Sequence, residues 1–312
     1  MNFKKNFFVF LFIFILSFTT LGYLTFAQDS SSKTAEEISV DLNRDGIKDT
    51  LIIQVKEDGT YDVRAKIKEK ELSLLCKDGP IGEYKNYWPL RVTLKDVTRD
   101  NIPEIFIQGT YKDAPIQSIF KYSKNELVNL SSSKDNILGF IDTTNNQSPK
   151  LLIGNFYNGE IYFKNYIVNS NTLREFNLNH KEDFMGKFTV SNLISYIETL
   201  PYSDYTICNN LFTSSISEDT LKLLDSLRWN NFIYKFQDAA LFDISSDDKR
   251  AIQEVKWKLN FKGVNPEGEN KNFTVTVVVS NIDKNTEDKK DSPYEYRITS
   301  LGIENISSLY SK

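Results

Sequence analysis

The sequence predicts a mainly β protein in which three repeated β units are followed by an α+β domain with an antiparallel sheet. An Asx-rich loop followed by an apolar strand occurs three times before about residue 150. Alternating apolar and polar runs are separated by Asx-Gly turns, and helical periodicity begins only after about Arg174. With 312 residues, of which 40% are hydrophobic, the chain is long enough to bury the cores of two domains.

Residues 1–27 have the layout of an export signal or of a membrane anchor. Lys4 and Lys5 precede an apolar stretch over 7–26, and Ala27 is a suitable last residue for a cleaved signal peptide. The apolar stretch is also long enough to span a bilayer as a helix. We therefore expect an extracytoplasmic protein, secreted or anchored by an uncleaved N-terminal segment, with residues 28–37 as a polar linker.

The loops that mark the repeats begin at Asp41, Asp96 and Asp142. They read VDLNRDGIKDTLIIQV, KDVTRDNIPEIFIQG and IDTTNNQSPKLLIGNF, each with the aspartate as its second letter. Counted from the aspartate as position 1, polar residues recur at positions 3 and 5, and a strand begins near position 9. Downstream, Asp58-Gly59 and Asn158-Gly159 predict hairpin turns. The spacing of the loops suits units of four strands.

The first loop has the residues that a calcium ion requires. Calcium takes six to eight oxygen ligands from carboxylates, amides and main-chain carbonyls. The side-chain candidates are Asp41, Asn43, Asp45 and Asp49, with the carbonyl of Ile47 as a further ligand and Gly46 at the bend. The alternative is that Asx-rich turns connect the strands without a metal, because Asp and Asn form local hydrogen bonds in turns.

The other two loops depart from this pattern to different degrees. The second loop retains Asp96, Thr98, Asp100 and Glu104, with Asn101 at the bend. The third loop has Asp142 as its only acid and Lys150 at position 9, so its charge should repel a cation. We expect calcium in the first loop, regard it as an open alternative in the second, and expect none in the third.

These residues resemble the FG-GAP or VCBS-type repeat, the calcium-loop blade of integrin-α-like β-propellers, over about residues 38–170. An EF-hand is excluded, because position 12 of the first loop is Ile52 and a strand follows instead of a helix. The resemblance implies propeller-like β repeats whose loop oxygens hold calcium, within a repeat domain over 38–180. Three units are fewer than the four to eight blades of a closed propeller, so further diverged blades or an open array stay as alternatives.

The C-terminal part, residues 185–312, predicts two helices followed by strands. Helices are expected at 191–200 and at 216–227, the second with Ser217 as its N-cap, and the polar stretch 281–293 is expected to be a hairpin loop. This order resembles ketosteroid-isomerase-like or cystatin-like α+β folds. If this domain were an enzyme, Asp238 or Asp243 would be candidate bases, although both are also ordinary candidates for loop or sheet-edge carboxylates.

Several classes of function find no support in the sequence. The net charge is −4 and no basic cluster accompanies a nucleic-acid motif, so no nucleic-acid partner is expected. His180 is the only histidine, and no nucleotide-binding or serine-hydrolase motif is present. Cys76 and Cys208 are too few to form a disulfide framework, and we favour two thiols.

The function expected from the sequence is that of an exported, non-enzymatic, calcium-stabilised protein that binds or adheres at the cell surface or outside the cell. A protein or a cell-wall glycan is the expected partner, and membrane contact is expected only through the N-terminal segment. One alternative is an extracytoplasmic enzyme with a pocket in the C-terminal domain, where a deep pocket with a buried carboxylate of raised pKa would favour it. Another is a membrane-tethered accessory subunit.

Overall fold

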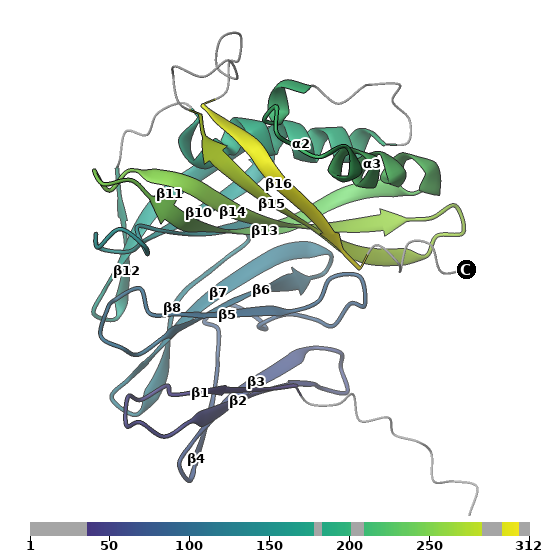
Figure 1. The fold of residues 1–312 in the computed structure, drawn as a ribbon. Coiled ribbons are helices and arrows are strands. Elements are labelled where there is room, and N and C mark those ends of the chain that lie inside the picture. The colour runs from purple at the N-terminus through teal and green to yellow at the C-terminus, as the bar shows by residue number, and fades with distance from the viewer. Residues whose placement is uncertain (1–35, 178–182, 201–208, 283–294, 306–312) are drawn as a thin grey trace, which may run out of the picture. The chain divides into compact units, whose positions relative to one another are not determined.

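The computed structural model describes residues 36–177, 183–200, 209–282 and 295–305 (Figure 1). The described residues from 37 onward belong to one compact unit. The predicted signal or anchor, His180, Cys208 and most of the predicted loop 281–293 lie outside the described residues. No helix in the described ranges is both long enough and apolar enough to cross a bilayer.

The first two repeats form separate four-stranded sheets, each with its strands in chain order. The first sheet contains β1 (Glu36–Val40), β2 (Asp49–Val55), β3 (Tyr61–Ile67) and β4 (Lys70–Ser73). The second contains β5 (Arg91–Lys95), β6 (Glu104–Tyr111), β7 (Ala114–Ser123) and β8 (Glu126–Ser133). Each Asx-rich loop therefore joins the first and second strands of its unit, and a strand precedes the loop as well as following it.

The third repeat belongs to an eight-stranded sheet that also contains the C-terminal strands (Figure 1). Its own strands are β9 (Ile137–Ile141), β10 (Lys150–Tyr157), β11 (Glu160–Asn169) and β12 (Thr172–Phe176). The remaining four are β13 (Ile233–Ser246), β14 (Ile252–Val264), β15 (Asn270–Asn281) and β16 (Tyr296–Glu304). β9 pairs in parallel with β13, and Gly139 allows the close approach because a Cβ there would lie 2.9 Å from atoms of Leu152 and Leu241.

The predicted Asx-Gly hairpins form, with turns of different length. Asn158 and Gly159 are a two-residue turn with positive φ at both residues, and Tyr157 pairs with Glu160 across it. The turn at Asp58-Gly59 is longer, because the last strand pair is Val55 with Tyr61. The sequence signal therefore predicted both hairpins correctly, but it was wrong for the length of the Asp58-Gly59 turn.

The helices lie near their predicted positions. α2 (Lys187–Thr199) begins four residues before the predicted start, and it ends before the extended residue Leu200. α3 (Glu218–Ser226) begins after Ser217, whose Oγ accepts the N–H of Thr220 as predicted for an N-cap. Short 3-10 helices are η1 (Phe184–Gly186), η2 (Asn209–Leu211) and η3 (Leu227–Asn230).

Three clusters of buried apolar residues hold these layers together. The first cluster fills the face of the eight-stranded sheet that α2 and α3 cover, around Trp257 and Phe261. The other two contain residues from neighbouring repeats, and β6 contributes to both because Ile105 and Ile107 belong to one and Phe106 to the other. β6 is thus buried on both faces, which explains its continuous apolar run.

The mainly β class and the antiparallel sheets predicted from the sequence are confirmed. No sheet closes into a barrel, and no closed propeller occurs, in the part of the chain that the structure describes. The propeller-like arrangement and the domain limits at 38–180 and 185–312 stay predictions. The β9–β13 pairing continues one sheet from the repeats into the C-terminal part.

Candidate functional site: three Asx-rich loops

The first loop, residues 41–48, is folded around the carboxylate of Asp41. Its Oδ1 accepts the main-chain N–H of Arg44 at 2.7 Å, and its Oδ2 accepts that of Gly46 at 2.9 Å. Gly46 has a φ of 83°, a backbone conformation that residues with a Cβ rarely adopt, and this explains the glycine at the bend. The loop thus turns its main chain toward the acidic side chains.

Two more carboxylates border the same loop. Asp45 accepts the N–H of Ile47 at 2.9 Å, and Asp49, at the start of β2, accepts the N–H of Leu42 at 2.9 Å. Asn43 donates its side-chain amide to Asp45 at 3.1 Å. All four predicted side chains of the first loop therefore take part in its local hydrogen bonding, as either a calcium loop or an Asx turn would require.

The first loop carries more buried negative charge than positive charge. Asp49 is only 4% exposed, and its pKa is raised, mainly by burial and further by the nearby carboxylates of Asp45 and Asp41. The ion pair of this loop is from Lys68 Nζ to Asp45 at 3.0 Å, and the lysine side chain is 64% exposed. The cation at the first loop is therefore a solvated one at its rim.

The second loop, residues 96–103, differs because a lysine enters it. Lys121 on β7 places its Nζ 2.9 Å from Thr98 Oγ1, 2.7 Å from Asp100 Oδ2 and 3.0 Å from Glu104 Oε1. The Lys121 side chain is 8% exposed and that of Glu104 is fully buried. Three of the four predicted calcium ligands of this loop therefore contact an ammonium group.

Asp96, the fourth predicted ligand, accepts a main-chain N–H instead of contacting Lys121. Its Oδ2 accepts the N–H of Asn101 at 2.8 Å, while its Oδ1 is buried and has no hydrogen-bond partner among the described residues. Asn101 takes the positive φ that Gly46 has in the first loop. The two loops thus share the bend at position 6 and the hydrogen bond from its N–H to the position 1 carboxylate. They differ in the group that neutralises the acids.

The third loop, residues 142–149, is neutralised by a lysine of its own. Lys150 forms an ion pair with Asp142, and Asn145 donates to the other oxygen of Asp142 at 2.6 Å. Asp243 accepts bonds from the main-chain and hydroxyl groups of Thr143 and Thr144, the shortest at 2.5 Å. A β13 carboxylate therefore fixes this loop to the C-terminal strands.

Side chains at position 4 connect the three loops in sequence. Arg44 donates to the carbonyl of Asp100 at 3.1 Å, and Arg99 donates to the carbonyl of Gln147. Asn145, at the same position of the third loop, donates to the carbonyl of Arg250 in the β13–β14 turn at 3.1 Å. The first loop therefore contacts the second, the second contacts the third, and the third contacts the β13–β14 turn.

The two carboxylates considered as catalytic bases have structural partners. Asp238 is 1% exposed, forms an ion pair with Arg91 and accepts the indole N–H of Trp88 at 2.5 Å. Asp243 is buried against the third loop. Both lie inside β13 rather than in a loop or at an exposed sheet edge, so that expectation was wrong, and both join β13 to the repeats.

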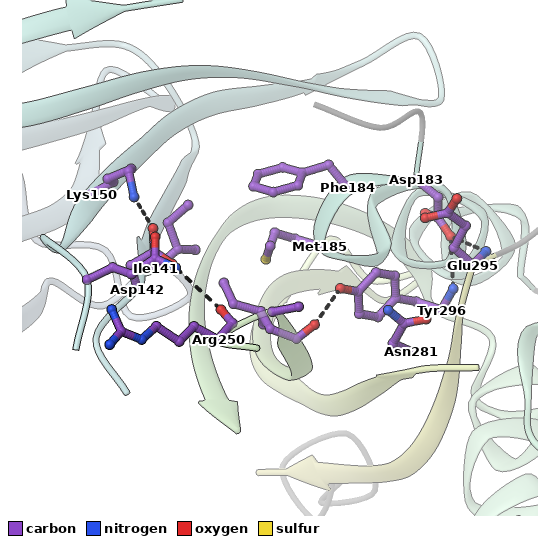
Figure 2. A pocket seen from close by; sticks show the side chains of 13 residues that line it. Ile141, Asp142, Lys150, Asp183, Phe184, Met185, Arg250, Asn281, Glu295 and Tyr296 are labelled. Carbon is purple, nitrogen blue, oxygen red and sulfur yellow. Dashed lines mark hydrogen bonds and ion pairs between the residues drawn. The ribbon is translucent and has the colours of Figure 1, made fainter. Parts of the chain in front are cut away.

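A cavity of about 530 Å³ lies beside the third loop and includes Asp142, Lys150 and Asp183 in its lining (Figure 2). Burial raises the pKa of Asp183, against the effect of its hydrogen bonds. Its carboxylate accepts three main-chain N–H groups, from Phe188, Glu295 and Tyr296. These bonds tie Asp183 to the chain on both sides of the cavity and give it a structural role there.

The fit of calcium to these loops differs from loop to loop. No three Asp, Glu, His or Cys side chains converge as a metal cage among the described residues. The first loop still fits calcium in its donor chemistry, because a carboxylate oxygen that accepts one N–H retains a lone pair, and its acids have no buried cation. The second loop does not fit calcium while Lys121 contacts its oxygens.

Sequence reasoning found the acids of the loops and the Lys150 of the third loop, and it missed the cation of the second loop. Lys121 lies on a later strand, and its only signal is a lysine inside the otherwise apolar run IFKY of β7. Cys76, whose pairing was left open, has a free thiol with its Sγ 3.2 Å from Ser118 Oγ.

Comparison with known proteins gives no family for this chain. No protein-family description matches the sequence, and no curated protein matches it. Among solved structures, a subtype N11 neuraminidase-like protein of A/flat-faced bat/Peru (H18N11) is similar at 11% identity and a TM-score of 0.26. That match covers 73% of this chain and 56% of the other. The likeness to FG-GAP or VCBS repeats stays a prediction from the loops.

Proposed function

We propose that the protein is an exported, non-enzymatic binding protein whose first repeat is stabilised by calcium, acting at the cell surface or outside the cell. One observation carries the proposal: the second and third loops each contact a buried or partly buried lysine, whereas within the described ranges the acids of the first loop pair only with the exposed Lys68. The loop acids attract a cation in all three repeats. In the first repeat this cation would be a calcium ion bound from solution.

Calcium in the first loop would join β1 to β2 and rigidify the tip of the first sheet. Asp41, Asn43, Asp45 and Asp49 would hold it together with the carbonyl of Ile47, and the ion would supply positive charge and no reaction chemistry. The side chain of Ile47 is 64% exposed at this tip. Binding residues are often carried on loops that a rigid scaffold positions, and a calcium-held loop would be such a support.

The proposed partner is a protein or a cell-wall glycan. Tyr157 and Tyr162 are both exposed and belong to one hairpin, β10–β11, where aromatic rings can stack on sugar faces or pack against a protein. The C-terminal sheet face under α2 and α3 is filled by side chains.

A calcium titration tests the proposal. Calorimetry on the purified protein should give saturable binding, and thermal melts should rise in excess calcium relative to chelator. Asp45→Ala should lose both effects. Asp58→Ala is the matched control, because Asp58 is an exposed turn aspartate outside the loop that also accepts a local N–H. Absence of heat and of any melting shift in the wild type would reject the calcium site.

The binding role needs a separate measurement. Co-sedimentation with purified cell-wall glycan, with and without calcium, should retain the wild-type protein in the pellet. Tyr157→Ala and Tyr162→Ala together should reduce retention, while the calcium titration stays unchanged. If retention is absent and a purified surface-protein panel also gives no binding, the calcium site would have a structural role only.

A further inference from the structure

We propose that Lys121 is a resident cation that closes the second loop in place of a metal, and that the residue facing position 9 decides which loop can take calcium. The comparison rests on the proposed calcium site of the first loop, whereas the assignment of Lys121 rests on contacts of the second loop alone. The position opposite position 9 lies on a neighbouring strand, outside the sequence pattern of the loops.

The contacts of Lys121 account for all its donor capacity. An ammonium group has three N–H donors, and three oxygens lie within 3.0 Å of Nζ: Thr98 Oγ1, Asp100 Oδ2 and Glu104 Oε1. These residues occupy positions 3, 5 and 9 of the loop. They are the positions whose side chains are expected to hold calcium in the first loop.

The ammonium is charged and fixed in place. Burial works to lower the pKa of Lys121, but its hydrogen bonds with Asp100 and Glu104 raise it above the ordinary value. Glu104 is fully buried and also accepts the N–H of Val97 at 2.9 Å through Oε2. A divalent ion at the same oxygens would lie in contact with a positive charge, and the repulsion would be strong in such a buried place.

The strand register explains why only the second loop has this lysine. Ile105 pairs with Phe120, so one step further along the ladder Glu104 faces Lys121. In the first sheet Thr50 pairs with Lys66, so the same step places Ile67 opposite Asp49. The first repeat therefore has a buried isoleucine where the second has the ammonium group.

In the third repeat the loop aspartate is neutralised by a lysine at a different position. Leu151 pairs with Tyr166, so Ile167 faces Lys150, which is itself the position 9 residue. Lys150 forms its ion pair with Asp142 from that position. A loop with a lysine at position 9 or opposite it has its own buried or partly buried cation, and the first loop, with Ile67 opposite an acid, has only the exposed Lys68 among the described residues.

Reciprocal substitutions test the assignment. Lys121→Ile copies the first repeat, and calorimetry should then count one more calcium ion per chain than in the wild type. In chelator this variant should melt below the wild type, and calcium should restore the difference. Lys164→Ile, which removes an exposed lysine from β11, is the control and should change neither the count nor the melting temperature by more than a small shift.

A second pair of variants keeps the test decisive if Lys121→Ile does not fold. Lys121→Gln retains a polar donor without the charge and should also gain a calcium ion. Ile67→Lys supplies an ammonium to the first loop and should abolish calcium binding there, while Ser73→Lys adds an exposed charge to the same sheet and should not.

The outcomes separate the inference from the proposed function. If the wild type binds no calcium and Lys121→Ile or Lys121→Gln binds one ion, the first-loop site is wrong and the role of Lys121 is supported. If the wild type binds calcium and both folded Lys121 variants bind the same number of ions, the role of Lys121 is overturned. Retention of full calcium binding by Ile67→Lys would overturn the rule for the position opposite position 9.

Discussion

The first and second loops have acids at positions 1, 5 and 9, but they neutralise them differently. In the second loop Lys121 is 8% exposed and contacts Asp100 and Glu104. In the first loop Lys68 is 64% exposed and contacts Asp45 alone. An acid pattern alone therefore does not define a metal site, because a residue on the neighbouring strand decides whether the acids already have a cation.

The largest difference between the two loops is expected in the unfolding free energy that is lost when the position 9 acid is removed. Glu104→Ala leaves Lys121 buried without its deepest partner and should cost about 3–5 kcal/mol of unfolding free energy. Asp49→Ala in chelator removes a carboxylate that has no buried cation, and the lost N–H bond to Leu42 should cost about 1 kcal/mol. Urea unfolding in chelator measures both, and equal losses would contradict the comparison.

Calcium should reverse the effect of a neutral substitution in the first loop. The pKa of Asp49 is raised, so its ionised form is disfavoured in the fold and stability in chelator should fall as pH rises from below 3.8 through the raised pKa. Asp49→Asn should therefore match or exceed the wild type at pH 7 in chelator. In calcium at a hundredfold excess over Kd the wild type should gain about 2.7 kcal/mol that the variant lacks.

The second loop should show the opposite pH dependence. Burial acts to raise the pKa of Asp100, but the hydrogen bonds from Lys121 and from the Ile102 N–H, with the charge of Lys121, together lower it. The stabilising contribution of this carboxylate is therefore present above the ordinary value of 3.8 and is lost as pH falls through the lowered pKa. Asp100→Asn should flatten this acid limb of the unfolding curve. An unchanged acid limb would show that the Lys121 pair does not contribute to the acid sensitivity.

The smallest effect is expected from the exposed lysine of the first loop. Lys68→Ala removes the rim charge beside Asp45 without exposing a buried group, and exposed ion pairs contribute little to stability. The melting temperature in chelator should hardly move, while calcium affinity should rise by a small factor because one competing cation is gone. A strong loss of stability would mean that Lys68 has the role that Lys121 has in the second loop.

The sequence contained most of what local chemistry determines. The three loops, the hairpins at Asn158-Gly159 and Asp58-Gly59, and the N-cap Ser217 could be predicted because each depends on residues a few positions apart. The start of α2 was missed because its N-terminus has no side-chain cap. The Phe188 N–H is instead bound by Asp183, five residues earlier, outside the usual capping pattern.

The long-range features could not be predicted from one sequence. Lys121 meets Glu104 only because β6 and β7 pair in one register, and a shift of one residue would turn the lysine to the other face. The parallel pairing of β9 with β13 joins segments about 100 residues apart, which no local pattern encodes. The same is true of the ion pair between Arg91 and Asp238.

The most direct test of the account is to move the cation from one loop to the other. The double variant Ile67→Lys with Lys121→Ile should be crystallised with calcium or with a lanthanide that replaces it, and anomalous scattering should locate the ion. The account predicts a peak among Asp96, Asp100 and Glu104 and none at Asp41, Asp45 and Asp49. A peak that stays in the first loop would contradict it.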